Sequence, residues 1–259
     1  MKGVNCRWRG CALTVGLVCS LALGWLPRTS SADAWLAAIS NRDTPALAAL
    51  LDRQADVDHS GVDGRTALMT AAGAGDLQLL ERLIAAGAGV NRRNRGAGTA
   101  LMFAAQYGEA ACAERLITAG AEVNLVGVKG FTALMIAVLK ARQPVVNLLL
   151  ANGADPNLVD VHGWTPLQRA VSAQRLDVVR QLLAHTETDV NHRNNTGSTA
   201  LHLAASSGQL ETVRALLRRG ADPKLEDQRG RSARDFAALG GHAFIAEVLR
   251  QAMDVDLNN

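Results

Sequence analysis

The chain has 259 residues, a formal net charge of +3 and only 3% aromatic residues. Residues 1–32 contain four basic residues, Lys2, Arg7, Arg9 and Arg28, and no acidic one. The other residues therefore carry 23 of the 27 Lys and Arg residues and all 24 Asp and Glu residues. A surface so evenly balanced gives no support for nucleic acid or an anionic membrane as a partner, and we expect neither.

Residues 1–32 are predicted to be a secretory signal peptide. A basic start precedes an uncharged apolar run from Cys11 to Leu26, which as a helix would span about 24 Å against a hydrocarbon core of about 30 Å. Small residues end at Ala32, so we expect cleavage before Asp33 and no membrane insertion afterwards. An uncleaved N-terminal anchor is the alternative.

Cysteine usage is compatible with export, because Cys112 is the one cysteine outside the predicted signal peptide. One thiol cannot form an internal disulfide. No basic cluster adjoins it in sequence, so Cys112 is expected to be a small apolar residue on a helix and not a reactive nucleophile.

The remaining residues repeat with a fixed period. The threonines at 66, 99, 132, 165 and 199 are separated by 33, 33, 33 and 34 residues, and Ser232 follows 33 residues later. An Ala stands five residues after each marker and a Leu seventeen after it, while Asp or Asn stands eight before the five threonines. A period of this length, with its own residue type at each position, indicates an array of structural repeats.

Each unit is predicted to hold two short helices and a turn. The Thr would cap the first helix, paired alanines would allow close helix packing, and a glycine with positive φ would end the helix. These glycines are Gly75, Gly108, Gly208 and Gly241. An apolar stripe such as residues 77–84 predicts the second helix, and a polar turn leads to the next unit.

Several stretches resemble the ankyrin repeat: GWTPLQRAV, LLLANGADPN and STALHLAASSGQLETVRALLRRGADP. The resemblance implies an all-α solenoid of stacked helix-turn-helix units with projecting β-turn fingers. It also implies a concave face, made by turn tips and first helices, that binds protein partners.

The expected ankyrin domain covers residues 33–253, with five full repeats between two capping repeats, and a flexible tail at 254–259. The predicted units are 33–60, 61–93, 94–126, 127–159, 160–193, 194–226 and 227–253. Residues 182–191 carry one extra residue and lack the glycine after the second helix, so an irregular corner is expected there.

Motifs that carry chemistry are missing. The sequence has no GxSxG, HExxH, GxxxxGK[ST] or paired CxxC pattern, and we predict no catalytic activity, no cofactor and no metal. His202 occupies a position that the family often fills with a structural histidine, which is the role we expect for it.

Binding of a protein partner by the concave face is the function that remains. Phe131, Trp164, Tyr107 and Leu139 are expected to lie near one another there, with truncation of such anchors costing about 2 kcal/mol or more. The predicted partner-binding residues are Phe131, Trp164, Tyr107, Leu139, Lys140, Lys129, His162 and Arg95. The alternative is that these aromatic rings only pack along their own turns. Arg92, Arg93 and Arg95 form a basic turn that is either merely solvated or suited to an acidic partner.

The sequence is therefore interpreted as an exported, non-catalytic module of a bacterial periplasmic type, which holds or protects an unidentified protein partner and is monomeric when free. Secretion beyond the periplasm is an alternative location. Two other functions stay open: an immunity-type inhibitor that neutralises a toxin or hydrolase, and a secreted effector that binds host proteins.

Overall fold

The computed structural model describes residues 31–53 and 56–255. Nearly all of the predicted signal peptide and residues 256–259 of the predicted tail lie outside these ranges. The first helix begins at Ser31, two residues before the expected cleavage site, and the last one continues to Val255, two residues into the expected tail.

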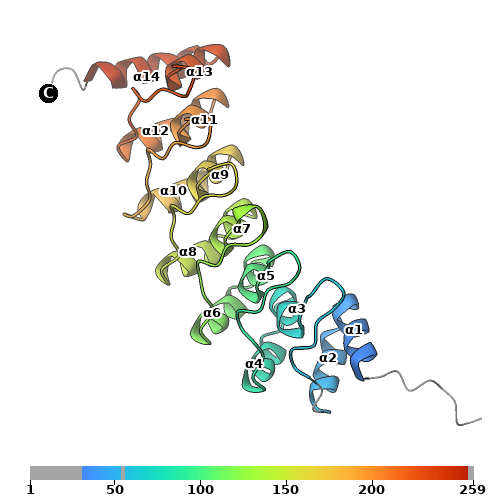
Figure 1. The fold of residues 1–259 in the computed structure, drawn as a ribbon. Coiled ribbons are helices and arrows are strands. Elements are labelled where there is room, and N and C mark those ends of the chain that lie inside the picture. The colour runs from blue at the N-terminus through green and yellow to red at the C-terminus, as the bar shows by residue number, and fades with distance from the viewer. Residues whose placement is uncertain (1–30, 54–55, 256–259) are drawn as a thin grey trace, which may run out of the picture.

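The described helices form two rows along an elongated stack (Figure 1). The inner row contains α1 (Ser31–Asn41), α3 (Ala67–Ala74), α5 (Ala100–Tyr107), α7 (Ala133–Leu139), α9 (Pro166–Ser172), α11 (Ala200–Ser206) and α13 (Ala233–Leu239). The outer row contains α2 (Thr44–Leu51), α4 (Leu77–Ala85), α6 (Ala110–Thr118), α8 (Gln143–Ala151), α10 (Leu176–Ala184), α12 (Leu210–Arg218) and α14 (Ala243–Val255). A short 3-10 helix, η1 (Val128–Gly130), lies in one of the turns.

The stack curves gently towards the inner row, from which the turns project as fingers (Figure 1). The described residues form seven helix pairs and contain two isolated β-bridges but no strand. The predicted all-α solenoid is thus confirmed. We call the surface formed by the inner row and the fingers the concave face.

The threonine markers begin the inner helices as predicted. The hydroxyl oxygens of Thr66, Thr99, Thr132 and Thr165 accept a hydrogen bond from the backbone N–H three residues later, at 3.2–3.4 Å. Each such cap contributes about 1 kcal/mol to helix stability. The regular spacing of Thr therefore reflects a local requirement that recurs wherever an inner helix starts.

The four predicted glycines have positive φ: Gly75 and Gly108 cap α3 and α5 with φ of 73° and 88°, and Gly208 and Gly241 directly follow the caps of α11 and α13 with φ of 70° and 75°. Ala141 and Gln174 adopt the same left-handed conformation after α7 and α9, with φ of 53° and 56°. A residue with a Cβ loses roughly 1–2 kcal/mol there. The geometry of the bend is thus imposed by the stack even where the sequence has no glycine.

Burial explains the Ala and Leu positions of the repeat. The alanine pairs 71–72, 104–105 and 204–205 are fully buried, which lets neighbouring inner helices approach closely. The leucines at 83, 116, 149, 182, 216 and 249 are fully buried in the outer row. Each buried leucine contributes about 1.5–3 kcal/mol relative to an exposed one. The apolar core is therefore continuous along the stack.

A ladder of asparagine side chains joins successive repeats. The Oδ1 atom of Asn124 accepts from the N–H of Asp155 at 2.9 Å, while its Nδ2 donates to the carbonyl of Gly153 at 2.9 Å. Asn91, Asn157 and Asn191 make the equivalent pair of bonds to their own next repeats. An amide can both donate and accept, which is why this position favours Asn.

The corner after α10 is irregular, as expected from the extra residue. His185 caps the helix in an extended conformation, and the hydroxyl of Thr188 donates to the carbonyl of Leu182 at 2.8 Å. The guanidinium of Arg219 donates to the carbonyls of Leu183 and Thr186 at 2.9 Å each. Side chains thus satisfy the carbonyls that the glycine-containing corners satisfy through the backbone.

We predict that Asn124→Ala lowers the free energy of unfolding by about 1–3 kcal/mol, because two backbone groups of the next repeat lose their partners. Urea unfolding followed by circular dichroism would measure it. Gln78→Ala, at an exposed position on α4, is the control and should change stability by less than about 0.5 kcal/mol. Equal effects of the two substitutions would contradict the role of the ladder.

Candidate binding surface

The fingers form a continuous edge because each one bonds to itself and to its neighbour. Within a finger, the N–H of Gly127 donates to the carbonyl of Phe131 at 2.8 Å. Between fingers, the N–H of Val161 donates to the carbonyl of Lys129 at 3.0 Å, and the N–H of Arg95 to that of Asp63 at 2.9 Å. The surface above the inner helices is consequently ordered from one repeat to the next.

Two sequence positions meet along the middle of the concave face. One is the residue directly before each helix cap: Arg65, Gly98, Phe131, Trp164, Ser198 and Arg231. The other is the residue four after the cap: Thr70, Phe103, Ile136, Arg169, Leu203 and Phe236. We call these two sets together the central row.

Phe131 and Trp164 are brought together by Arg169. The guanidinium carbon of Arg169 lies 4.6 Å from the ring centre of Trp164 and 5.5 Å from that of Phe131. Asp160, whose side chain is fully buried, accepts from Nε of Arg169 at 2.6 Å and fixes its orientation. Two half-buried aromatic rings and one ion-paired arginine thus form a rigid cluster.

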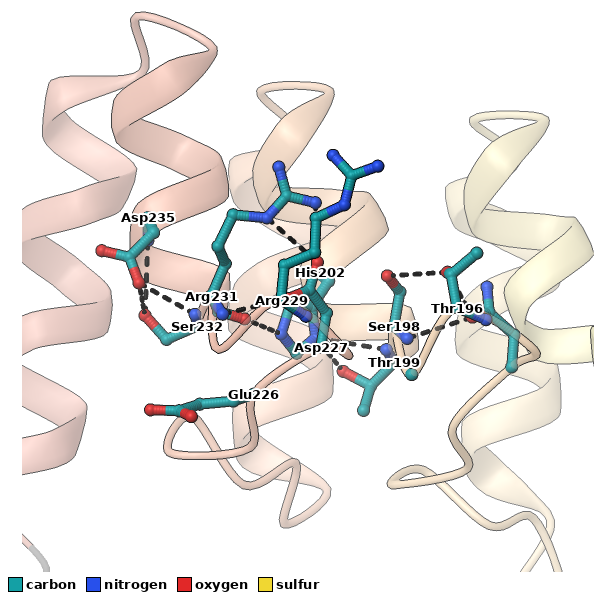
Figure 2. Close-up of polar contacts among 12 residues, drawn as sticks. Thr196, Ser198, Thr199, His202, Glu226, Asp227, Arg229, Arg231, Ser232 and Asp235 are labelled. Atoms are coloured by element: carbon teal, nitrogen blue, oxygen red, sulfur yellow. Dashed lines mark hydrogen bonds and ion pairs between the residues drawn. The ribbon is translucent and has the colours of Figure 1, made fainter.

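The same kind of contact recurs at both ends of the central row. The guanidinium of Arg65 lies 4.5 Å from the ring centre of Phe103, and that of Arg231 lies 4.4 Å from the ring centre of Phe236. Arg231 is ion-paired with Asp227, as Figure 2 shows. Hydrogen bonds from the side chain and backbone of Arg231 lower the pKa of Asp227 to about 2.

The other predicted partner-binding residues lie along the two borders of the concave face. Arg95, Lys129 and His162 are exposed on the fingers. Leu139 and Lys140 lie at the far end of α7, half-buried and exposed respectively.

Tyr107 does not join the Phe131–Trp164 cluster. It ends α5, and its ring lies 5.6 Å from the guanidinium of Arg42 and packs beside Gly73, both in preceding repeats. The Tyr107 ring thus packs against the two preceding repeats, whereas Phe131 and Trp164 meet at Arg169.

Sequence reasoning missed Phe103 and Arg169, although their spacing relative to the caps could have revealed them. It also missed a hollow of about 310 Å³ beside Gly98, lined by Met102, Phe103, Phe131 and Ile136 among others. The hollow lies where Gly98 has no side chain to fill the central row. A second hollow, of about 390 Å³, lies beside Ser198, another small residue of the row.

His202 is structural, as predicted. It is 1% exposed, its Nδ1 accepts from the N–H of Thr199 at 3.1 Å, and its Nε2 lies 3.1 Å from the carbonyl of Arg231 (Figure 2). Nδ1 is an acceptor, so Nε2 carries the hydrogen and donates. Gln168 makes the same two kinds of bond one repeat earlier, to the N–H of Thr165 and the carbonyl of Ser198.

Burial is the main cause that lowers the pKa of His202, since desolvation disfavours the charged ring. Nearby Asp227 opposes this shift and Arg193 adds to it. Protonation of Nδ1 would also remove the acceptor for the N–H of Thr199.

Two further candidates for chemistry are the thiol of Cys112 and clusters of possible metal ligands. Cys112 is buried, and burial together with Glu109 and Asp76 raises the pKa of its thiol to about 11, so it is protonated at neutral pH. Among the described residues, no group of three or more His, Cys, Asp and Glu side chains is arranged to hold a metal ion. In the same part of the chain, every helix is too short or too polar to cross a bilayer.

The chain belongs to the ankyrin-repeat family. The family model described as "Ankyrin repeats (3 copies)" matches residues 34–126, 68–160, 101–194, 134–227 and 185–259, which overlap to cover the whole stack. The crystal structure of the human ASB11 ankyrin repeat domain is similar, with a TM-score of 0.71 and 27% identity over 84% of this chain and 96% of that one. Repeats of this family are protein–protein interaction modules, and the fold is typically a non-catalytic scaffold.

Curated relatives match shorter stretches. The chain is 41% identical over 59 residues to human Espin-like protein, which is 23% of this chain and 6% of that protein. It is 45% identical over 56 residues to Notch-regulated ankyrin repeat-containing protein B of Danio rerio, 22% of this chain and 50% of that protein. The chain thus spans at most half the length of these relatives.

We predict that His202→Gln makes folding stability less dependent on pH. The folded state holds the imidazole of His202 neutral, with a pKa below the ordinary value of about 6.5 that applies in the unfolded chain. The contribution of His202 to folding stability is therefore fully present above about pH 6.5, and it is lost as the pH falls towards the lower folded-state pKa. Glutamine keeps both hydrogen bonds, as Gln168 does, and does not titrate.

Urea midpoints at about pH 7.5 and about pH 5 would measure this effect. Asp227 stays ionised across that interval, so it contributes equally to both chains. The wild-type midpoint should fall further than that of the variant. An identical fall in both chains would contradict the assignment of His202.

Proposed function

We propose that the protein is exported and holds or protects a protein partner in the periplasm through its concave face, without catalysis. The observation that carries the proposal is the cluster of Phe131, Trp164 and Arg169, which presents aromatic and guanidinium groups in fixed positions. Large aromatic side chains and arginine dominate the binding energy of protein interfaces.

Preorganisation of this cluster supports a role in binding. Asp160 already neutralises Arg169 and restricts its rotamers, so little conformational entropy remains to be lost when a partner covers the rings. The contact between rings and guanidinium is intramolecular, and the half-exposed faces of both rings are available for further burial.

Export rests on the N-terminal sequence alone. A basic start, an apolar run of sixteen residues and small residues before Asp33 support a cleavable signal. Cell fractionation and N-terminal sequencing would test it. A protein that starts at Asp33 in the periplasmic fraction agrees with the proposal, and one confined to the cytoplasm with residues 1–32 attached contradicts it.

The immunity-type alternative predicts a different behaviour of the captured complex. Affinity capture of the tagged protein from the periplasm, followed by mass spectrometry, would identify the partner. An enzyme whose activity falls on binding would indicate an inhibitor, whereas unchanged or increased activity would indicate a holding or protecting role. Host proteins as partners would indicate an effector.

We predict that the combined substitution Phe131→Ala and Trp164→Ala weakens binding to the captured partner by about 30-fold or more, equivalent to about 2 kcal/mol. Titration calorimetry would measure the affinity, and circular dichroism would check that helicity is retained. Phe244→Ala is the matched control, because that ring is 61% exposed on the outer row. A double variant that folds and binds like the wild type would remove the cluster as a binding site.

A further inference from the structure

The hollow beside Gly98 is suited to an apolar side chain. Among its lining residues are Met102, Phe103, Phe131 and Ile136, and none of the ten is charged. Its volume of about 310 Å³ is at the lower end of the range of about 300–1,000 Å³ found for ligand pockets. The hollow is partly open to solvent, so that a protruding group can enter it.

A third hollow, which is basic and lies beside Arg95, adjoins the apolar one. It has a volume of about 590 Å³ and shares Asn94 and Gly96 with its neighbour. Arg42, Arg65 and Arg95 contribute to its lining, against one acid, Asp63. Asp63 lies 3.5 Å from the guanidinium of Arg65 and offsets its charge. The guanidinium groups of Arg42 and Arg95 therefore leave the lining of this hollow with a net positive charge.

We propose that these two adjoining hollows form one binding site for an extended acidic segment of the partner protein. A large apolar side chain, such as that of Leu, Met or Phe, enters the hollow beside Gly98, and a neighbouring Asp or Glu pairs with Arg95 and Arg42. This inference rests on the proposed function and specifies the chemistry of the partner. Charge complementarity selects an acidic segment over a basic one.

The hollow beside Ser198 is a less suitable candidate for the apolar anchor. Asp227, Arg229 and Arg231 all line it, so it combines charges of both signs with its apolar wall. An apolar side chain placed there would desolvate these groups without replacing their hydrogen bonds. The hollow beside Gly98 therefore remains the site where apolar burial and a separate basic region occur together.

A random peptide display library, selected on the protein purified from cells that express the full chain, would test the proposal. The enriched peptides should carry Asp or Glu next to a large apolar residue. The strongest of them is then synthesised and titrated into protein with ¹³C-labelled methionine methyl groups. The methyl group of Met102, which lines the apolar hollow, should shift, while that of Met253 on α14 should not.

Two variants locate the peptide within the site. Gly98→Leu fills the apolar hollow. The backbone there is not in the left-handed region, and the added Cβ would lie 3.3 Å from Oδ1 of Asn94, which must shift by a few tenths of an ångström; circular dichroism checks that the variant is folded. Arg95→Glu reverses a charge in the basic hollow at an exposed position. Each should weaken binding of the peptide by about tenfold or more, and the effect of Arg95→Glu should become smaller at high salt.

Arg218→Glu, an exposed charge reversal on the outer row, is the matched control and should leave the peptide affinity unchanged. The inference would be overturned if no peptides with an acidic residue next to a large apolar one are enriched, or if the peptide affinity is unchanged by both Gly98→Leu and Arg95→Glu. If the captured partner still depends on Phe131 and Trp164 in that event, the proposed function stands and only the two-hollow site fails.

Discussion

A single helix pair of this protein cannot bury its own apolar surface, and that constraint determines the rest of the structure. The alanines of the inner row and the leucines of the outer row are excluded from water only because another pair lies beside them. Repeat stacks of this kind gain most of their stability at interfaces between neighbours. Hydrogen bonds such as those of Asn124 then fix the register between pairs.

Stacking also separates the residues that hold the fold together from those that are open to variation. Buried positions repeat nearly the same residue, whereas the central row changes from Arg65 to Gly98, Phe131 and Trp164 without affecting the core. The helices and fingers position each of these side chains next to its counterpart in the next repeat. A surface that is both variable and rigid suits recognition of another protein.

Local signals made most of the fold predictable. Threonine caps, alanine pairs and the 33-residue period each depend on a few neighbouring residues, and the structural role of His202 was implied by the resemblance to the ankyrin repeat. The candidate surface was less predictable, because its contacts join positions almost forty residues apart. The pairing of Arg169 with Phe131, the hollow left by Gly98 and the contact of Tyr107 with Arg42 depend on how one repeat is offset from the next.

Photo-crosslinking in the native cell tests most directly whether the concave face contacts a protein. A benzophenone amino acid placed at Phe131 should form a crosslinked species with one main protein, because this ring is half-buried in the middle of the concave face. The same group placed at Phe244 on the outer row should not. Crosslinking from position 244 and none from position 131 would contradict the account.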